Sequence, residues 1–278
     1  MKNILSIDTE SWIHFYEDAL KIKKTSSDER KIMDDGYIRH AIEKILDVLD
    51  EFEQKATFFI VAEIYDWHPR AVEEIQNRGH EIAYHTHTHP LLTKAAILER
   101  ELVLSKKFIK KFNPKGFRAP LMYLPPDSWR YLKKYGFKYS SSTYDAYAVF
   151  NYEGIDEIPV SIVAYRKASV SKELPKNLTM SLLLRSIPIG SGLFMALLKA
   201  RGTSYFIRKL NERGIPAILF IHPWQLYETK EIASIPFKMK LLLKNPFCLP
   251  YTSNIQKMAR TLLQAHTFTS FQDYYYGQ

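Results

Sequence analysis

Short apolar runs alternate with longer segments of helical periodicity along the first part of the chain. The run that begins at Ile4 is short and apolar, as in a buried strand, and it ends at Asp8. Residues 37–52 place apolar side chains three and four positions apart, the spacing of a helix that buries one face. The predicted elements, in order, are a strand ending at Asp8, a helix over 37–52, a strand over 56–62, a helix over 69–78 and a strand over 80–84. This alternation predicts an α/β fold with a parallel sheet.

The same alternation continues, less regularly, towards the C-terminus. The further predicted elements are a helix over 91–112, a strand beginning at 116–117, a helix beginning at 125–126, a strand near Tyr139, a helix over 254–265 and a strand over 268–271. The polar residues 18–35 show no periodicity, so they are predicted to form a surface loop, with a mobile flap over a site as the alternative.

Length and composition bound the domain organisation. The 278 residues, of which 46% are hydrophobic, suit one domain over 1–278, with an inserted segment at about 144–213. The single cysteine, Cys248, excludes an intramolecular disulfide and suits a reducing compartment. The chain enters its first strand without a leader-like segment, and no apolar run reaches the roughly 18 to 20 residues that span a bilayer. A cytoplasmic location is therefore predicted.

Three histidines, His85, His87 and His89, stand close together after the third predicted strand. The spacing of His85 and His89 puts both imidazoles on one face of a helical turn, from which both can reach one metal ion, while His87 points elsewhere. Two neutral imidazoles need a carboxylate to complete a site for a divalent metal. Asp8 and Glu10, at the end of the first strand, lie two positions apart and therefore on the same side.

Two further polar groups follow predicted strands. Arg118 comes after the strand that begins at 116–117, and His222 follows the β-like run over 217–220. With the first carboxylates and the histidine cluster, they make four polar groups at the C-terminal ends of predicted strands. Active sites of α/β barrels are built in this way.

These groups give the chain a resemblance to the polysaccharide deacetylases, also called the NodB-homology or carbohydrate esterase 4 family. The family's first motif, an aspartate base and a metal-binding acid, is similar to Asp8-Thr9-Glu10, and its histidine motif is similar to residues 85–89. Its Arg-x-Pro motif matches Arg118-Ala119-Pro120, and its last motif matches the segment around His222. The resemblance implies a distorted (β/α) barrel of about seven parallel strands. The sequences of the first motif, of His-Pro-Trp-Gln and of residues 157–161 are most similar to those of the subgroup linked to exopolysaccharide synthesis.

The chemistry of amide hydrolysis gives each of the polar groups in these motifs a predicted role. The roles are metal binding by Glu10, His85 and His89, general base by Asp8, orientation of that base by Arg118, and general acid by His222. Zn²⁺ is the metal predicted by default, with Co²⁺ or another divalent ion as the alternative.

Other roles stay open for the same residues. Asp8 could bind the metal directly, and Glu10 would then contact the ligands without binding the metal itself. Arg118 could be a structural ion-pair partner, and His222 could be a packed histidine at a strand end. His87 is predicted to be structural or exposed.

The chain departs from the family's pattern at three places. Glu10 stands where the family usually has an aspartate, a longer side chain that would move the metal or change its identity. Leu121 and Tyr123 replace the common continuation after Arg-x-Pro. With Trp224 they are the predicted substrate-binding residues, and the backbone amide near Leu121 would help to form an oxyanion hole. The family's fourth motif supplies an aspartate that tunes the acid histidine, and here only Asp145 is available, at a shifted position.

The predicted activity is metal-dependent removal of N-acetyl groups from an amino-sugar glycan or glycan precursor. The alternatives are hydrolysis of a small cyclic amide, as in allantoinase-like proteins, and glycan binding with weak catalysis. The net charge of +9 favours an anionic substrate or surface. Residues 192–213 predict a basic amphipathic helix, which could lie on a membrane beside a lipid-linked sugar, although packing of its apolar face on the barrel is favoured. Nucleic acid is not expected, because the basic residues form no recognised binding motif. The oligomeric state stays open.

Overall fold

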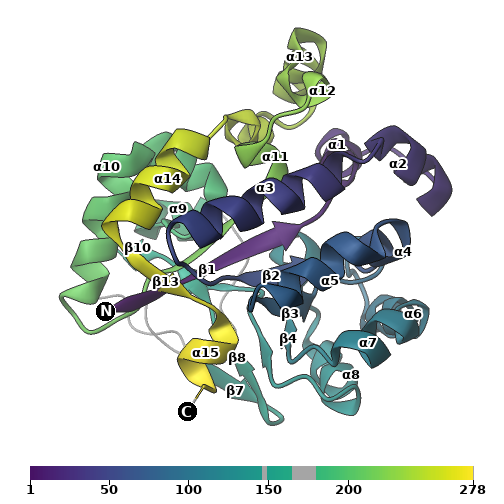
Figure 1. Ribbon diagram of the computed structural model, residues 1–278, viewed down its shortest axis with the longest axis horizontal. Coiled ribbons are helices and arrows are strands. Elements are labelled where there is room, and N and C mark those ends of the chain that lie inside the picture. Colours follow the sequence, from purple (N-terminus) through teal and green to yellow (C-terminus); the bar gives the residue numbers. More distant parts are fainter. Residues whose placement is uncertain (146–148, 165–179, 278) are drawn as a thin grey trace.

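A curled, mostly parallel sheet forms the centre of the computed structural model, which describes residues 1–145, 149–164 and 180–277 (Figure 1). Parallel strands follow in the order β12, β1, β2, β3, β4, β5 and β8, with antiparallel β7 beside β8 and with β13 beside β1. The strands are β1 (Lys2–Thr9), β2 (Thr57–Ile60), β3 (Glu81–Tyr84), β4 (Gly116–Phe117), β5 (Tyr139–Ser140), β7 (Phe150–Tyr152), β8 (Ile155–Glu157), β12 (Ile218–Ile221) and β13 (Thr267–Thr269). The predicted α/β fold with about seven parallel strands is confirmed.

Helices cover the outer face of the sheet (Figure 1). Those that share the main hydrophobic core with the strands are α3 (Tyr37–Glu51), α4 (Glu63–Trp67), α5 (Pro69–Asn77), α6 (Ala95–Leu104), α7 (Lys106–Phe112), α8 (Trp129–Lys134), α10 (Gly192–Asn211), α11 (Pro223–Leu226) and α14 (Gln256–Ala265). Leu5 and Ile7 of β1 belong to this core. Ser6 and Asp8 alternate with them and both contact Arg118 on the inner side, as the pleat of a strand requires.

The register of the central strands aligns their C-terminal ends. Thr9 pairs with Ile60, Ile60 pairs with Tyr84, and Ile7 pairs with Ile221. The residues that follow these strands therefore meet at one edge of the sheet, which is where α/β folds build their sites.

Short strands and a short helix lie between β5 and β12 in the sequence. They include β6 (Tyr144–Asp145), β9 (Val160–Ser161), β10 (Val163–Ala164), β11 (Ser186–Ile187) and the helix α9 (Met180–Arg185). β9 pairs with β6, and the Ser161 carbonyl accepts from Gly190 N–H at 2.9 Å. The Gly190 carbonyl in turn accepts from Phe220 of β12 at 2.7 Å. A Cβ at position 190 would lie 2.2 Å from the Ile218 carbonyl oxygen, so this close approach requires glycine.

The prediction of a loop over residues 18–35 is wrong. The segment contains the end of α1 (Trp12–Leu20) and the whole of α2 (Ser27–Asp34). Ser26 and Glu29 form a reciprocal capping box at the start of α2. The helix lacks an apolar stripe because it is held by buried charged side chains, Arg30 and Asp34, instead.

The helix predicted over 91–112 is divided at Ser105. Its parts are α6 and α7, and the Ser105 hydroxyl lies 2.9 Å from the Tyr84 hydroxyl and 3.2 Å from Nδ1 of His87. These contacts tie the break to the loop that carries the histidines.

The helix predicted over 192–213 is α10, and it turns sharply at Lys199, where φ is 57°. Met195, Ile207 and Leu210 pack in the main core, whereas Leu197 is exposed. Most of its apolar side chains therefore serve the barrel. Among the described residues, no helix has the length and hydrophobicity that a membrane-crossing segment needs.

The remaining elements are short helices, and they lie at both ends of the strands. They are α12 (Lys230–Ala233), α13 (Ile235–Lys244), the 3₁₀ helix η3 (Pro246–Thr252) and α15 (Phe271–Tyr275), besides the short 3₁₀ helices η1 (Pro120–Met122) and η2 (Pro126–Ser128). Phe237 and Leu241 of α13 pack with α1 in a separate hydrophobic cluster. This cluster connects α13 to the first residues after β1.

Candidate active site

The histidine cluster lies in an irregular loop directly after β3, not on the helical turn that its spacing predicted. Thr86 and His89 have positive φ angles of 65° and 55°, which fold the loop back on itself. His89 N–H donates to the Thr86 hydroxyl at 3.1 Å, and His87 N–H donates to the buried Glu101 carboxylate at 3.0 Å. This tight loop brings the rings of His85 and His89 to a centroid separation of 4.9 Å.

Glu10, just after β1, meets these two imidazoles. Ligand atoms of Glu10, His85 and His89 all lie within 4.8 Å of one another, and all three residues are buried. Oε2 of Glu10 lies 3.2 Å from Nε2 of His89 but has no hydrogen-bond donor among the described residues. Burial, followed by the charges of Asp18 and Asp8, raises the pKa of Glu10 well above its ordinary value. A buried carboxylate oxygen without a donor, beside two imidazoles, is a fitting environment for a divalent cation.

Both imidazoles are held through their outer nitrogens. Nδ1 of His85 lies 2.7 Å from the Arg118 carbonyl oxygen, and Nδ1 of His89 lies 2.8 Å from Oδ2 of Asp18. Because these oxygens accept, both Nδ1 atoms carry the proton and both Nε2 atoms keep a lone pair for a metal. Burial is the main cause that lowers the pKa of His85 to about 4 and that of His89 to about 3. Both rings are therefore neutral near pH 7.

Asp8 faces the fully buried guanidinium of Arg118. Nη1 of Arg118 donates to Asp8 Oδ1 at 2.5 Å and to the Ser6 hydroxyl at 2.8 Å, while Nε donates to the Ser141 carbonyl at 2.7 Å. Burial, the largest influence, raises the pKa of Asp8, but Arg118, with smaller contributions from nearby imidazoles, outweighs it and the pKa is lowered. Arg118 thus holds Asp8 ionised and fixed in orientation.

His222 follows β12 and lies on the other side of Glu10. Its Nε2 is 3.4 Å from Oε1 of Glu10, and its Nδ1 is 3.1 Å from Oε1 of Gln225. Trp224 stacks on the imidazole with centroids 4.4 Å apart and on Phe15 from the other side at 4.9 Å. Burial is the main cause that lowers the pKa of His222. The contacts with the Gln225 amide and the Trp224 indole fix the orientation of the imidazole ring.

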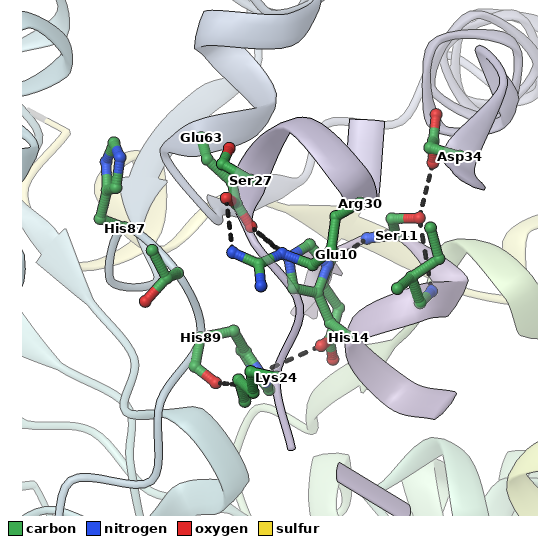
Figure 2. A network of polar contacts seen from close by, with 12 residues as sticks. Glu10, Ser11, His14, Lys24, Ser27, Arg30, Asp34, Glu63, His87 and His89 are labelled. Carbon is green, nitrogen blue, oxygen red and sulfur yellow. Dashed lines mark hydrogen bonds and ion pairs between the residues drawn. The ribbon is translucent and has the colours of Figure 1, made fainter. Parts of the chain in front are cut away.

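The segment α1–α2 reaches into this site from outside the barrel (Figure 2). Asp18 of α1 contacts His89 and also lies 3.0 Å from Nζ of Lys24, which donates to the His89 carbonyl. The segment is held against the barrel by Arg30, which donates from Nε and Nη2 to the buried Glu63 carboxylate at 2.9 and 2.8 Å. His14 lies 2.7 Å from the same carboxylate. Figure 2 shows His14, Arg30 and Glu63 in contact, with His87 pointing away from them.

A cavity of about 450 Å³ opens above the five titratable groups. Its lining includes Asp8, Glu10, His85, His89 and His222, with apolar and aromatic walls from Phe15, Leu121, Met122, Tyr144, Trp224 and Tyr251. Of the predicted substrate-binding residues, Leu121 and Trp224 line it, and Trp224 is buried beneath His222. Tyr123 is exposed at the surface, and Met122 occupies the wall instead. Asp145 lines a different cavity with Ile158 and Ile218.

The sequence analysis missed several residues of the site, among them Gln225 and Asp18. Gln225 stands three positions after His222, the spacing at which a side chain reaches back to the start of a helix, so the spacing was a usable signal. Asp18 had no such signal, because its contact with His89 joins positions 71 apart. The aspartate sought for His222 is thus replaced at its Nδ1 by the Gln225 amide.

Comparison with known proteins identifies the family. A model described as polysaccharide deacetylase matches residues 32–140, and one described as a domain of unknown function (DUF3473) matches residues 140–276. The chain carries a polysaccharide deacetylase domain. This match confirms the predicted family for residues 32–140, whereas the exopolysaccharide-associated subgroup stays a prediction. The candidate site draws on both matched regions and on the residues before them, because Asp8 and Glu10 precede residue 32 and His222 lies beyond residue 140.

The deacetylase domain is similar to parts of curated glycan deacetylases. A peptidoglycan-N-acetylglucosamine deacetylase from Bacillus cereus is 32% identical over 117 residues, which are 40% of this chain and 42% of that protein. A chitooligosaccharide deacetylase from Rhizobium leguminosarum bv. trifolii is 38% identical over 92 residues, 31% of this chain and 43% of that protein. The chain thus spans less than half the length of these relatives.

One solved structure resembles nearly the whole chain. A Mycobacterium smegmatis protein assigned to the polysaccharide deacetylases has a TM-score of 0.51 and 19% identity, covering 96% of this chain and 93% of that one. At this identity the likeness establishes the distorted-barrel fold.

Proposed function

We propose that the deacetylase domain is a metal-dependent hydrolase that removes N-acetyl groups from an amino-sugar glycan or glycan precursor. One observation carries the proposal. Glu10, His85 and His89 converge at the floor of a cavity, with Asp8 and His222 beside them. Amide hydrolysis needs an activated carbonyl, an activated water and a proton for the leaving amine, and this arrangement offers a group for each.

Glu10, His85 and His89 would hold the metal. Two imidazole nitrogens with one carboxylate are a common set of protein ligands for catalytic zinc, with Co²⁺ as an alternative ion. The fit rests on Oε2 of Glu10, which has no hydrogen-bond donor among the described residues, and on the two Nδ1–H groups that leave both Nε2 atoms a lone pair. When bound, such a cation supplies Lewis acidity for the acetamide carbonyl and the attacking water.

Asp8 would accept the proton of the attacking water. Its lowered pKa keeps it ionised, and Arg118 occupies one oxygen, Oδ1. The other carboxylate oxygen is then available on the cavity side of β1. The contact of Asp8 with Arg118 supports its role as a base over its alternative role as a metal ligand, because Glu10 already fills the carboxylate position.

In its protonated, imidazolium form, His222 would donate the Nε2 proton to the leaving amine. The Gln225 amide oxygen accepts from Nδ1–H, so Nε2 is the nitrogen that faces Glu10 and the cavity. Trp224 fixes the plane of the ring by stacking. Leu121, whose φ is 53°, and Trp224 would contact substrate at the wall, and the backbone amide at Leu121 would help bind the oxyanion.

The substrate class follows from the cavity and the relatives. The cavity is large enough for a sugar ring, and aromatic side chains in its wall suit the apolar faces of pyranoses. The named relatives act on peptidoglycan N-acetylglucosamine or chitooligosaccharides, which carry the same acetamide group. A lipid-linked sugar, the exopolysaccharide-associated subgroup and a cytoplasmic location stay predictions.

Metal analysis and acetate release from chitooligosaccharides test the proposal together. His85→Ala and His89→Ala should lose both bound Zn²⁺ and activity. Asp8→Asn should keep the metal and lose about two to four powers of ten in rate. His87→Ala is the matched control, because its side chain points away from the cluster, and it should keep both. Full metal occupancy in His89→Ala would contradict the assignment, and loss of metal in Asp8→Asn would make Asp8 a ligand.

A further inference from the structure

Helix α13 carries apolar side chains on two opposite faces. Phe237 and Leu241 form the buried face and pack against α1. The opposite face begins at Ile235, two positions and about half a helical turn before Phe237. The exposed residues of this face, with their exposed fractions, are Ile235 (76%), Met239 (53%), Leu242 (49%), Leu243 (82%) and the adjoining Phe247 (69%). We call these five residues the α13 surface.

The α13 surface is an organised stripe and not a scatter of single residues. Ile235, Met239, Leu242 and Leu243 stand at i, i+4, i+7 and i+8, the spacing of one helical face. Soluble monomers rarely expose such a contiguous apolar patch without a binding role. Figure 1 places α13 at an extremity of the molecule, away from the sheet, where a flat partner can reach it.

Positive charges flank the stripe. Lys238 and Lys240 lie on either side of Met239, and Lys244 ends the helix. Lys238 is 3.7 Å from Glu228, while Lys240 and Lys244 are exposed. The sequence from 232 to 272 contains no aspartate or glutamate. An apolar stripe with basic flanks is complementary to a bilayer with anionic head groups, which takes up both kinds of side chain.

We propose that the α13 surface docks the protein onto an anionic lipid bilayer. Asn245, Cys248 and Tyr251, which follow α13 in sequence, line the site cavity, so the docked bilayer lies beside the cavity mouth. The site would then work on glycans held at the membrane surface. That consequence rests on the proposed function, whereas the docking itself does not.

Vesicle co-flotation tests the docking without any measurement of activity. The full chain is mixed with phosphatidylcholine vesicles, or with vesicles in which about a third of the lipid is phosphatidylglycerol. Binding is expected to the anionic vesicles only, and it should weaken as added salt screens the lysines. Leu242→Ser/Leu243→Ser should lower the partition coefficient at least about tenfold. Lys240→Glu/Lys244→Glu should abolish the preference for anionic lipid.

Matched controls come from two other helices, α6 and α7. Val103 and Leu104 are also adjacent, exposed and helical, at 45% and 51%, and Val103→Ser/Leu104→Ser should bind as the wild type does. Lys106→Glu/Lys110→Glu is the corresponding charge control. Absence of binding to anionic vesicles at low salt overturns the proposal. Equal loss in the control pair overturns it too. Light scattering that shows a dimer dispersed by Leu242→Ser/Leu243→Ser, with no vesicle binding, would make the surface a contact between copies.

Discussion

Two helical segments border the same cavity and are built in opposite ways. The α1–α2 segment contributes Phe15 and Asp18 to the cavity and is fixed by buried charges, with Arg30 and Glu63 almost fully enclosed. The segment from α13 to η3 contributes Tyr251 and leaves apolar side chains in solvent. Buried charges thus help to hold the first segment, whereas the second exposes one whole apolar face of a helix.

The difference is explained by what each segment does for the site. The α1–α2 segment holds a carboxylate, Asp18, against one imidazole of the proposed metal site, and a set of directional ion pairs fixes this position. Helix α13 needs only one packed stripe, Phe237 and Leu241, to stay attached to α1. Its other face is free for a partner. Four predictions test whether the two segments are held in these different ways.

The largest effect is expected from Arg30→Met. The substitution removes the partner of Glu63 and leaves a buried carboxylate beside His14, which should cost about 3 to 5 kcal/mol in the free energy of unfolding. Urea denaturation measures the change. Arg39→Ala, which removes an exposed pair with Glu43, is the control and should change little. A small loss in Arg30→Met would show that α1–α2 is not fixed by its charges.

Acid should loosen the α1–α2 segment through Glu63. Burial raises the pKa of this carboxyl, but the hydrogen bonds and charges of His14 and Arg30 outweigh it and hold the pKa at about 2, against 4.5 ordinarily. The contribution of a carboxylate with a lowered folded-state pKa is present above its unfolded pKa and lost as the pH falls through the folded one. The ion pair should thus contribute about 3 kcal/mol above pH 4.5 and progressively less towards pH 2.

Comparison with Glu63→Gln isolates the contribution of the Glu63 carboxylate to the free energy of unfolding. Urea unfolding is followed from about pH 7 to about pH 3 for both proteins. The wild type should lose its advantage over Glu63→Gln as the pH falls, because the variant has no charge to titrate there. A constant difference across this range would exclude Glu63 as the source of the acid sensitivity.

Asp18→Ala should weaken metal binding without unfolding the protein. Without the carboxylate, Nδ1 of His89 loses its acceptor and the ring is no longer fixed, which should lower the affinity for Zn²⁺ about 10- to 100-fold. Isothermal titration calorimetry measures the affinity. Asp18→Asn should recover part of it, because the amide oxygen still accepts from Nδ1–H. Asp28→Ala on the exposed side of α2 is the control, and an equal effect there would remove the role of Asp18.

The sequence predicted those parts of the fold and site that depend on local patterns. Apolar runs located β1 and β3, and short motifs located His85, Arg118 and His222 at the ends of strands. Hydrophobic patterns in a sequence indicate which side chains are buried by apolar packing. A segment such as α2, in which the charged Arg30 is buried in ion pairs, therefore lacks this pattern and is predicted to be a loop. The four-residue spacing of the histidines equally suits a helix and a tight loop, and only the positive φ angles distinguish them.

The smallest stability effect is expected from the face of α13 that reaches solvent. Leu242→Ser/Leu243→Ser removes no packed side chain, since both leucines are exposed, so the free energy of unfolding should change by only about 0.5 kcal/mol per residue. Leu241, one position earlier and fully buried, provides the contrast: Leu241→Ala leaves a cavity against α1 and should cost about 2 to 5 kcal/mol. Urea denaturation compares the variants. If the double serine variant were as unstable as Leu241→Ala, the exposed leucines would stabilise the fold itself. The distinction between a packed face and an exposed binding face of α13 would then be wrong.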